Sequence, residues 1–321
     1  MIKTIGILIL LTLIEIVTFH YYIKRLKKVN YTQFVRDLGP KNHHIKNGTP
    51  TAGGIIIIVF LILNFIIVKN VNGFQFQIND YIFLITIILF GILGFMDDFK
   101  IIKKKKNDGL KPLSKLIVET LIVIVIFILL KIQKVDNTII VLNQVIDLSY
   151  FNLVWIMFYI LAWSNSFNIT DGLDGLASYL SLSVLLGIFI VGKIEHNELL
   201  VVSSLCMFFS IIGFLVFNFH PALVFMGNVG SHALGAGIAI LGILSKNEVV
   251  FGIMGLVFVF ETISVILQVI YFKKTKGKRL FRMAPFHHHL ELSGFKEQTI
   301  SLIFVLISIL LVIISIILKG I

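Results

Sequence analysis

Two pairs of aspartates lie where long apolar stretches end. Asp97 and Asp98 are adjacent, whereas Asp171 and Asp174 stand three residues apart in a segment without lysine or arginine. Carboxylates this close repel one another and are costly to desolvate, so they favour a cation or a hydrogen-bonding ligand. Magnesium prefers one or two carboxylates together with phosphate oxygens. The spacing indicates metal-assisted chemistry on a phosphorylated substrate. A helix that ends in water would also explain the first pair, whereas an N-terminal cap explains at most one aspartate of the second.

Glycines, hydroxyls and cations accompany these acids along the chain. The segment 46–54 joins Lys46 and Thr51 to three glycines, a composition typical of a phosphate cradle but also of a simple turn before a helix. A run of four lysines at 103–106, which includes Lys105, follows the first aspartate pair. Acids beside lysines suit a metal ion and a polyphosphate, and the lysines also suit anionic lipid headgroups.

Three further segments carry polar groups. Glycines around the asparagine at 228 let the backbone approach a ligand closely, although they also permit close helix packing. Three consecutive histidines cannot all point one way, which argues against a zinc site from this run and favours donors to phosphate or ribose. Glu261 and the glutamine at 268 interrupt an apolar stretch, and such residues usually face a protein interior. The candidate ligand residues here are Asn218, Asn228, Gln268, His287, His288 and His289.

The composition excludes a soluble domain. Hydrophobic residues make up 57% of the 321 residues and charged residues only 14%, too few to cover a water-exposed surface. The formal net charge of +11 is explained by basic residues beside membrane helices, so no nucleic-acid partner is expected. The single cysteine, Cys206, excludes disulfides and thiolate metal sites.

Ten apolar stretches are long enough to place helices across a membrane, which needs roughly 20 residues each. They span residues 5–22, 53–68, 81–95, 116–130, 146–163, 173–191, 199–217, 233–244, 249–272 and 300–318. We therefore expect one all-α polytopic membrane domain over residues 1–321, with both termini on the same side.

The basic residues predict which side is the cytoplasm. Alternate loops hold 21 of the 28 lysines and arginines, which places these loops in the cytoplasm and both termini on the opposite face. The five loops are 24–52, 97–115, 164–172, 218–232 and 273–299. All of the polar motifs fall in or beside them, so one active site at the cytoplasmic boundary is expected.

Taken together, the motifs resemble those of the phospho-N-acetylmuramoyl-pentapeptide transferases, within the polyprenyl-phosphate hexose-1-phosphate transferases. The matching segments are 46–51, Asp97-Asp98, 168–177 and 283–289, in the family's order. The histidine triplet after Met-Ala-Pro favours the muramoyl branch over the N-acetylglucosamine-phosphate branch. The resemblance implies transfer of the phospho-sugar from UDP-N-acetylmuramoyl-pentapeptide to undecaprenyl phosphate, giving lipid I and UMP for peptidoglycan at the bacterial cytoplasmic membrane. It also implies Mg²⁺ and allows a homodimer.

The resemblance assigns roles to individual residues. Asp97 would remove a proton from the lipid phosphate with support from Asp98, and Asp171 would bind Mg²⁺. Asp174 would lie near the uracil. The remaining residues of the nucleotide and diphosphate pocket would be Lys46, Thr51, Lys105, Asn168, Asn218, Gln268, His287, His288 and His289. Direct attack is favoured over an aspartyl-phosphate intermediate, but the sequence does not decide between them.

Two positions depart from the family pattern. Asn228 stands where the family usually has an aspartate at the magnesium, so an amide oxygen would replace a carboxylate there. The family's lysine after the aspartate pair falls on Ile101. A catalytically silent relative is therefore one alternative function, and a hexosamine-phosphate transferase for another envelope polymer is a second. A transporter is the third, although its polar residues would be expected at mid-helix.

Overall fold

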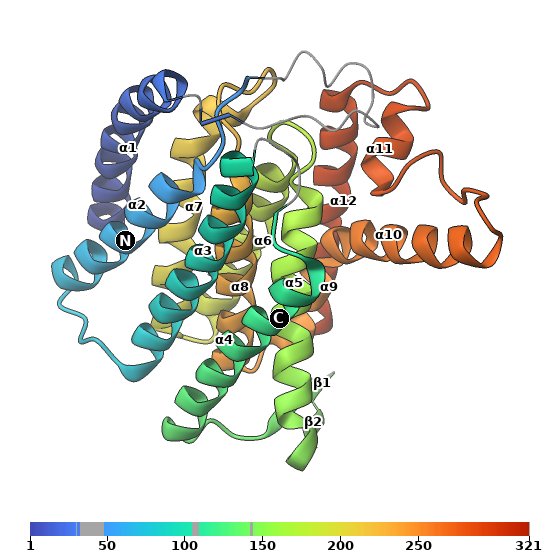
Figure 1. Cartoon of the computed structure of the whole chain (residues 1–321). Coiled ribbons are helices and arrows are strands. Elements are labelled where there is room, and N and C mark those ends of the chain that lie inside the picture. The colour runs from blue at the N-terminus through green and yellow to red at the C-terminus, as the bar shows by residue number, and fades with distance from the viewer. Residues whose placement is uncertain (30, 33–47, 105–108, 142–143, 321) are drawn as a thin grey trace.

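The chain forms a bundle of long helices (Figure 1). The computed structural model describes residues 1–29, 31–32, 48–104, 109–141 and 144–320. Ten helices among these residues are long and apolar enough to cross a membrane, which confirms the predicted all-α polytopic fold. They are α1 (Ile2–Lys28), α2 (Gly54–Val71), α3 (Ile78–Lys104), α4 (Pro112–Ile132), α5 (Asn152–Thr170), α6 (Leu176–Ile194), α7 (Glu198–Asn218), α8 (Gly227–Ser245), α10 (Leu256–Lys274) and α12 (Glu297–Leu318).

Helix α8 lies at the centre of the bundle. Every residue from 229 to 243 is buried, and α3 and α5 make the most extensive contacts with it. Glycines allow two neighbours to approach its first turn. A Cβ on Gly94 of α3 would lie 2.1 Å from the carbonyl oxygen of Asn228, and one on Gly54 of α2 would lie 2.1 Å from the backbone nitrogen of Gly230. Only glycine permits this packing, which fixes the start of α8 between α2 and α3.

The third helix is longer than predicted. The apolar stretch 81–95 indicated a short helix followed by a loop from 97, but α3 continues to Lys104. Asp97 and Asp98 therefore lie inside the helix, near the end that is predicted to face the cytoplasm, and not in a loop. The helix continues because tertiary partners satisfy both carboxylates, as described below, and hydropathy alone does not reveal such partners.

The predicted single helix 249–272 is wrong. Gly255 divides it into a short helix α9 (Glu248–Met254) and α10. A Cβ at position 255 would lie 2.3 Å from Cη2 of Trp163, so the indole ring packs where the backbone breaks. After this break α10 leaves the bundle and projects sideways (Figure 1).

A β-hairpin precedes α5, where the sequence predicted helix from 146. Strands β1 (Thr138–Val141) and β2 (Gln144–Asp147) pair antiparallel, with Ile139 opposite Ile146. Oδ1 of Asp147 accepts a hydrogen bond from the backbone nitrogen of Ser149 at 2.8 Å, which turns the chain into the 3₁₀ helix η2 (Ser149–Phe151) before α5 begins.

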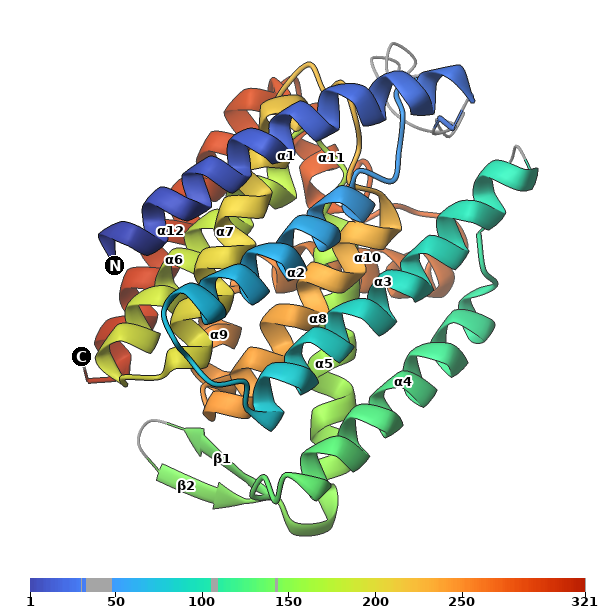
Figure 2. The same ribbon diagram turned by 90° about the vertical axis from the view of Figure 1, so that its left-hand side faces the viewer.

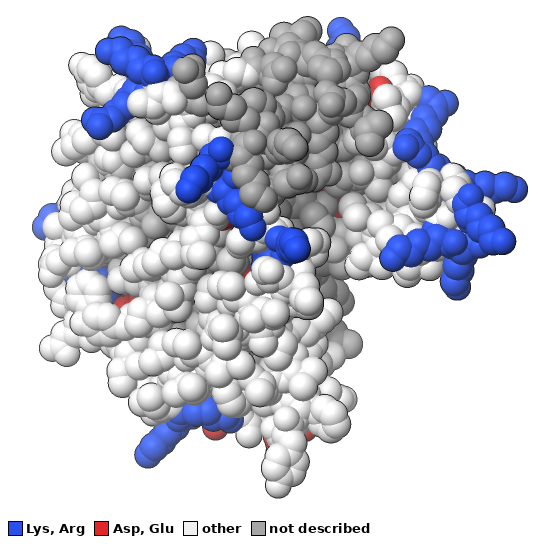
Figure 3. Space-filling view, viewed as in Figure 1, with Lys and Arg blue, Asp and Glu red and all other residues white. Residues whose placement is uncertain are grey.

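The predicted functional segments gather at one end of the bundle. The ends of α1 and α3, the starts of α2 and α12, and the short helix α11 (Phe286–Glu291) lie at the top of Figure 1. Both chain termini lie at the left of Figure 2, away from this end. Figure 3 shows lysines and arginines over the ends of α1 and α10, with a broad belt below them that carries few charged side chains. Which face is cytoplasmic stays a prediction.

Candidate active site

Asp98 joins α3 to the start of α8. Its Oδ1 accepts a hydrogen bond from the backbone nitrogen of Asn228 at 3.1 Å, and its Oδ2 accepts one from Val229 at 3.2 Å. Gly227 has a φ of +74°, and a Cβ there would lie 2.7 Å from Oδ2 of Asp98. The carboxylate thus satisfies two N–H groups that a helix start leaves open, in the favourable field of the helix dipole.

Asp97, the preceding residue of α3, has side-chain partners. Its Oδ2 accepts a hydrogen bond from Nδ2 of Asn228 at 2.9 Å and lies 3.7 Å from Nζ of Lys115 on α4. Its Oδ1 accepts one from the backbone nitrogen of Leu110. This carboxylate is held in place while it remains beside a cation, an arrangement that suits a proton acceptor next to an anionic substrate.

The amide of Asn228 is oriented by its neighbours. Nδ2 of Asn168 donates to Oδ1 of Asn228 at 2.6 Å and to Oγ of Ser231 at 2.8 Å. Reversing the Asn228 amide would set its oxygen against the Asp97 carboxylate and its NH₂ against the NH₂ of Asn168. The donor side of Asn228 therefore faces Asp97, and its oxygen faces α5.

Asp171 lies at the C-terminal end of α5, one turn beyond Asn168. Burial, followed by the negative charges of Asp98 and Asp174, raises the pKa of Asp171 well above its usual range. A divalent cation would relieve this repulsion, and carboxylate oxygens are the donors that Mg²⁺ prefers. The residues therefore fit the metal at Asp171. The predicted second ligand, Asn228, has its oxygen engaged by Asn168 in this structure.

Asp174 contacts the segment after α7. Its Oδ2 lies 2.9 Å from Nδ1 of His220 and accepts a hydrogen bond from the backbone nitrogen of Ala222 at 3.1 Å. Glu297, the first residue of α12, completes a group whose ligand atoms lie within 4.8 Å of one another. The mixed oxygen and nitrogen donors suit a transition metal better than Mg²⁺. A cavity of about 430 Å³ with mainly apolar walls opens beside this group.

Asn218 and Thr51 hold loops together. The Oδ1 of Asn218 accepts hydrogen bonds from the backbone nitrogen of Gly175 at 3.2 Å and from Oγ of Ser178 at 3.3 Å, while Nδ2 donates to the carbonyl of Val224 at 3.0 Å. Thr51 is buried against the turn at position 227. Both residues shape the walls of the site, and their contact with substrate stays a prediction.

The three histidines point in three directions, as their succession implied. His287 is fully buried against Glu261 of α10, with 3.1 Å between Nδ1 and Oε2. Nδ1 of His288 lies 2.6 Å from Oε2 of Glu291. Nδ1 of His289 accepts a hydrogen bond from the backbone nitrogen of Arg282 at 3.1 Å.

Gln268 lies farther along α10 and anchors the loop that follows that helix. Its Oε1 accepts hydrogen bonds from the backbone nitrogens of Leu280 at 3.1 Å and Phe281 at 2.8 Å. The amide thus fixes the path of the chain towards α11. A contact between Gln268 and substrate stays a prediction.

The structure adds two residues to the predicted site and leaves two undetermined. Lys46 and Lys105 lie outside the described residues. Lys115 contacts Asp97 although the sequence pointed to the lysine run 103–106, and its position in the first turn of α4 was the available signal. Glu261 was expected to face the interior, but only the structure reveals that it pairs with a histidine.

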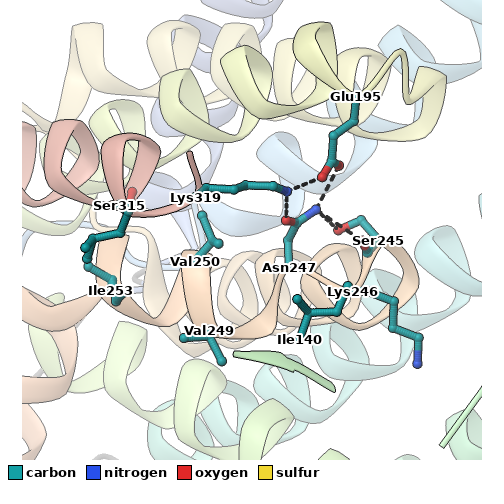
Figure 4. A pocket seen from close by; sticks show the side chains of 11 residues that line it. Ile140, Glu195, Ser245, Lys246, Asn247, Val249, Val250, Ile253, Ser315 and Lys319 are labelled. Atoms are coloured by element: carbon teal, nitrogen blue, oxygen red, sulfur yellow. Dashed lines mark hydrogen bonds and ion pairs between the residues drawn. The ribbon is translucent and has the colours of Figure 1, made fainter. Parts of the chain in front are cut away.

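A separate cavity of about 130 Å³ lies at the opposite end, between the hairpin, the α8–α9 turn and the C-terminus (Figure 4). Nδ2 of Asn247 donates to Oε2 of Glu195 at 2.9 Å, and Lys319 pairs with the same glutamate. These groups satisfy one another and tie α6, α8 and α12 together, so this cavity is best explained as packing.

Comparisons with known proteins agree with the motifs. The family model for glycosyl transferase family 4 matches residues 81–246. A phospho-N-acetylmuramoyl-pentapeptide-transferase of Listeria innocua serovar 6a is 37% identical over 95% of this chain and 93% of that protein. Proteins of the same name are 39% identical in Rickettsia prowazekii (strain Madrid E), over 95% of this chain and 90% of that protein, and in Oceanobacillus iheyensis, over 93% and 92%.

Proposed function

The chain belongs to the phospho-N-acetylmuramoyl-pentapeptide transferases of glycosyl transferase family 4, and on that premise we propose that it transfers the phospho-sugar of UDP-N-acetylmuramoyl-pentapeptide to undecaprenyl phosphate. The products are lipid I, used for peptidoglycan, and UMP. The observation that carries the proposal is the convergence of Asp97, Asp98 and Asn168 on Asn228 at the start of α8. In this proposal the membrane-bound phosphate and the soluble nucleotide meet at these groups.

Asp97 is the proposed base. A carboxylate held beside the lipid phosphate can accept its proton as a general base. The deprotonated lipid phosphate oxygen attacks the sugar-bearing phosphorus, the bond from that phosphorus to the UMP oxygen breaks, and UMP leaves with the bonding electrons. Lys115 offers a positive charge beside Asp97 to the approaching phosphate. Asp98 holds α3 and α8 in register for this step.

Asp171 is the proposed magnesium ligand, together with phosphate oxygens of the substrate. When bound, the ion would supply charge neutralisation at the diphosphate. Asn168 orients the amide of Asn228, which in turn holds Asp97. In this proposal the negative charge that binds the metal ion is on Asp171, and the amide at position 228 serves as a hydrogen-bond donor. The other predicted ligand residues complete the nucleotide pocket in this proposal.

The bacterial cytoplasmic membrane is the proposed location, with the site facing the cytoplasm. The bias of basic residues towards the loops at the site supports this orientation. A soluble nucleotide substrate also requires a site open to the cytoplasm. A homodimer belongs to the proposal as well, and light scattering of the detergent-purified protein tests it.

Purified protein incubated with UDP-N-acetylmuramoyl-pentapeptide, a polyprenyl phosphate and Mg²⁺ should release UMP. Release from UDP-N-acetylglucosamine alone would support the hexosamine-phosphate alternative and refute the muramoyl assignment. Absence of turnover with both donors would support the catalytically silent relative that Asn228 suggests. Chelation of Mg²⁺ should abolish release, and release that persists in excess chelator would contradict the metal assignment.

A further inference from the structure

Glu261 and His287 form a fully buried pair between α10 and α11. Each side chain is 0% exposed, and Nδ1 of His287 lies 3.1 Å from Oε2 of Glu261. The backbone nitrogen of His287 also donates to Oε1 of the same carboxylate at 3.1 Å. An ionised carboxylate only accepts hydrogen bonds, so this contact places a hydrogen on Nδ1 and fixes the plane of the ring.

The other ring nitrogen faces the turn that carries Asp171. Nε2 of His287 is buried and has no hydrogen-bond partner among the described residues. A Cβ on Gly172 would lie only 2.4 Å from Nε2, so the ring edge packs directly on this glycine. A buried polar group without a partner destabilises the fold, and a ligand group at the turn would remove that cost.

A purely structural pair explains only half of this arrangement. Pinning α11 to α10 requires the bonds to Nδ1 and to the backbone nitrogen, but not a second nitrogen aimed at residue 172. A phenylalanine or leucine would fill the same volume without burying an unpaired nitrogen. The contact with the Asp171–Gly172 turn therefore indicates that Nε2 meets a polar atom which arrives with the substrate.

We propose that Glu261 is a positioning residue for the transfer reaction: its carboxylate fixes the ring of His287 with the hydrogen on Nδ1, so that Nε2 at the Asp171–Gly172 turn accepts a hydrogen bond from a ribose hydroxyl of the nucleotide. The inference rests on the proposed function, because it assigns the ribose of that nucleotide to this turn. Glu261 itself touches no substrate atom and acts through His287.

The first test is a double-mutant cycle on UMP release. Glu261→Gln keeps the shape of the side chain but replaces one acceptor oxygen with a donor, so it no longer fixes the hydrogen on Nδ1. We expect it to lower kcat by about 10–100-fold, as loss of an orienting partner does for ligand histidines. His287→Asn should lower kcat at least as much, and the double variant should be no worse than His287→Asn.

Thr262→Val is the matched control. Thr262 is the next residue on α10, and its Oγ1 donates to Oγ of Ser166 at 2.8 Å, so this variant also loses a hydrogen bond between helices. Its kcat should stay within about twofold of the wild type. The proposal would be overturned if the two single losses of kcat multiplied in the double variant. Wild-type kcat in Glu261→Gln, or a loss of kcat in Thr262→Val equal to that in Glu261→Gln, would also overturn it.

The second test does not need turnover. In protein labelled with ¹⁵N-histidine, the His287 signals are identified by their loss in His287→Asn. Nδ1 should carry a hydrogen in the wild type, and addition of UMP with Mg²⁺ should shift Nε2 more than Nδ1. Gly172→Ala should abolish the UMP-induced shift while Nδ1 keeps its hydrogen, because the new Cβ displaces the ring edge from the turn.

The two tests separate the possible failures. Wild-type protein that releases no UMP contradicts the proposed function, whereas the resonances still report on the pair. The positioning role is overturned if Nδ1 carries no hydrogen. It is also overturned if UMP raises the thermal stability of the protein, and so binds, without shifting the Nε2 signal. Glu261→Gln protein that fails to fold leaves Gly172→Ala to decide the question.

Discussion

Replacing Asn228 with aspartate tests how this chain arranges its charges. The wild-type amide donates to Oδ2 of Asp97 at 2.9 Å. A carboxylate there removes the donor and sets a second negative charge about 4 Å from the first. At an effective dielectric constant of about 20, two charges at that distance repel by about 4 kcal/mol, equivalent to about three pKa units. Without a cation the pair should retain a proton and destabilise the start of α8.

Magnesium should reverse this penalty. In thermal unfolding of the detergent-purified protein, Asn228→Asp should be less stable than the wild type in chelator, and Mg²⁺ should stabilise it by the larger increment. Binding to the folded state alone raises stability by RT ln(1 + [L]/Kd). The Mg²⁺ concentration that gives half-maximal UMP release should fall by about tenfold, which corresponds to about 1.4 kcal/mol of added binding.

Asn228→Ala is the control for this experiment. It also loses the hydrogen bond to Asp97 but adds no charge, so its stability should fall without any gain in response to Mg²⁺. Equal Mg²⁺ titrations for the aspartate and alanine variants would refute the reasoning, because they would show that no cation reaches position 228.

Three further outcomes are expected. Asp97→Asn should lower kcat by about 10²–10⁴-fold while the protein still folds, and wild-type UMP release would contradict the role as base. In the presence of chelator, the stability of the protein should fall as pH rises from about 4. The pKa of Asp171 is raised in the folded state, so the unfolded chain releases this proton at lower pH than the folded protein does. Asp171→Asn should make the dependence of stability on pH weaker. Gly94→Ala, whose Cβ would lie 2.1 Å from the Asn228 carbonyl oxygen, should unfold at a clearly lower temperature, whereas Gly91→Ala meets only the end of the Ile58 side chain and should change the Tm little.

The membrane spans were predictable because the bilayer imposes a length on apolar stretches. Each of the ten predicted stretches overlaps a membrane-length helix among the described residues, although 249–272 divides at Gly255 and 146–163 begins in a strand. Their ends were less predictable, since polar residues continue a helix whenever a distant segment satisfies them. Asp98 continues α3 because α8, 130 positions away, supplies the backbone donors. Gly255 breaks a helix because Trp163 packs against it.

The motifs of the candidate site could be predicted from the sequence, but the contacts between their side chains could not. The acids, asparagines and histidines were found because such residue types are rare beside apolar stretches. Their partners were not, since Lys115 and Glu261 lie within or beside long helices whose facing depends on packing. Asn228 shows the same limit. The sequence presents it as a missing charge, whereas the structure presents it as the donor that holds Asp97.

Asp97 and Asp98 show why the fold is needed to divide the work between identical neighbours. Consecutive positions on a helix point about 100° apart, so the two carboxylates meet different surroundings. Asp98 faces the start of α8, and each of its oxygens accepts a hydrogen bond from a backbone N–H. A base needs an oxygen that can exchange these partners for a proton, and backbone donors fixed in a helix cannot move aside. The partners of Asp97 on Oδ2 are the side chains of Asn228 and Lys115, which can rotate as the phosphate arrives. The geometry therefore favours Asp97 as the proposed base and gives the helix contact to Asp98.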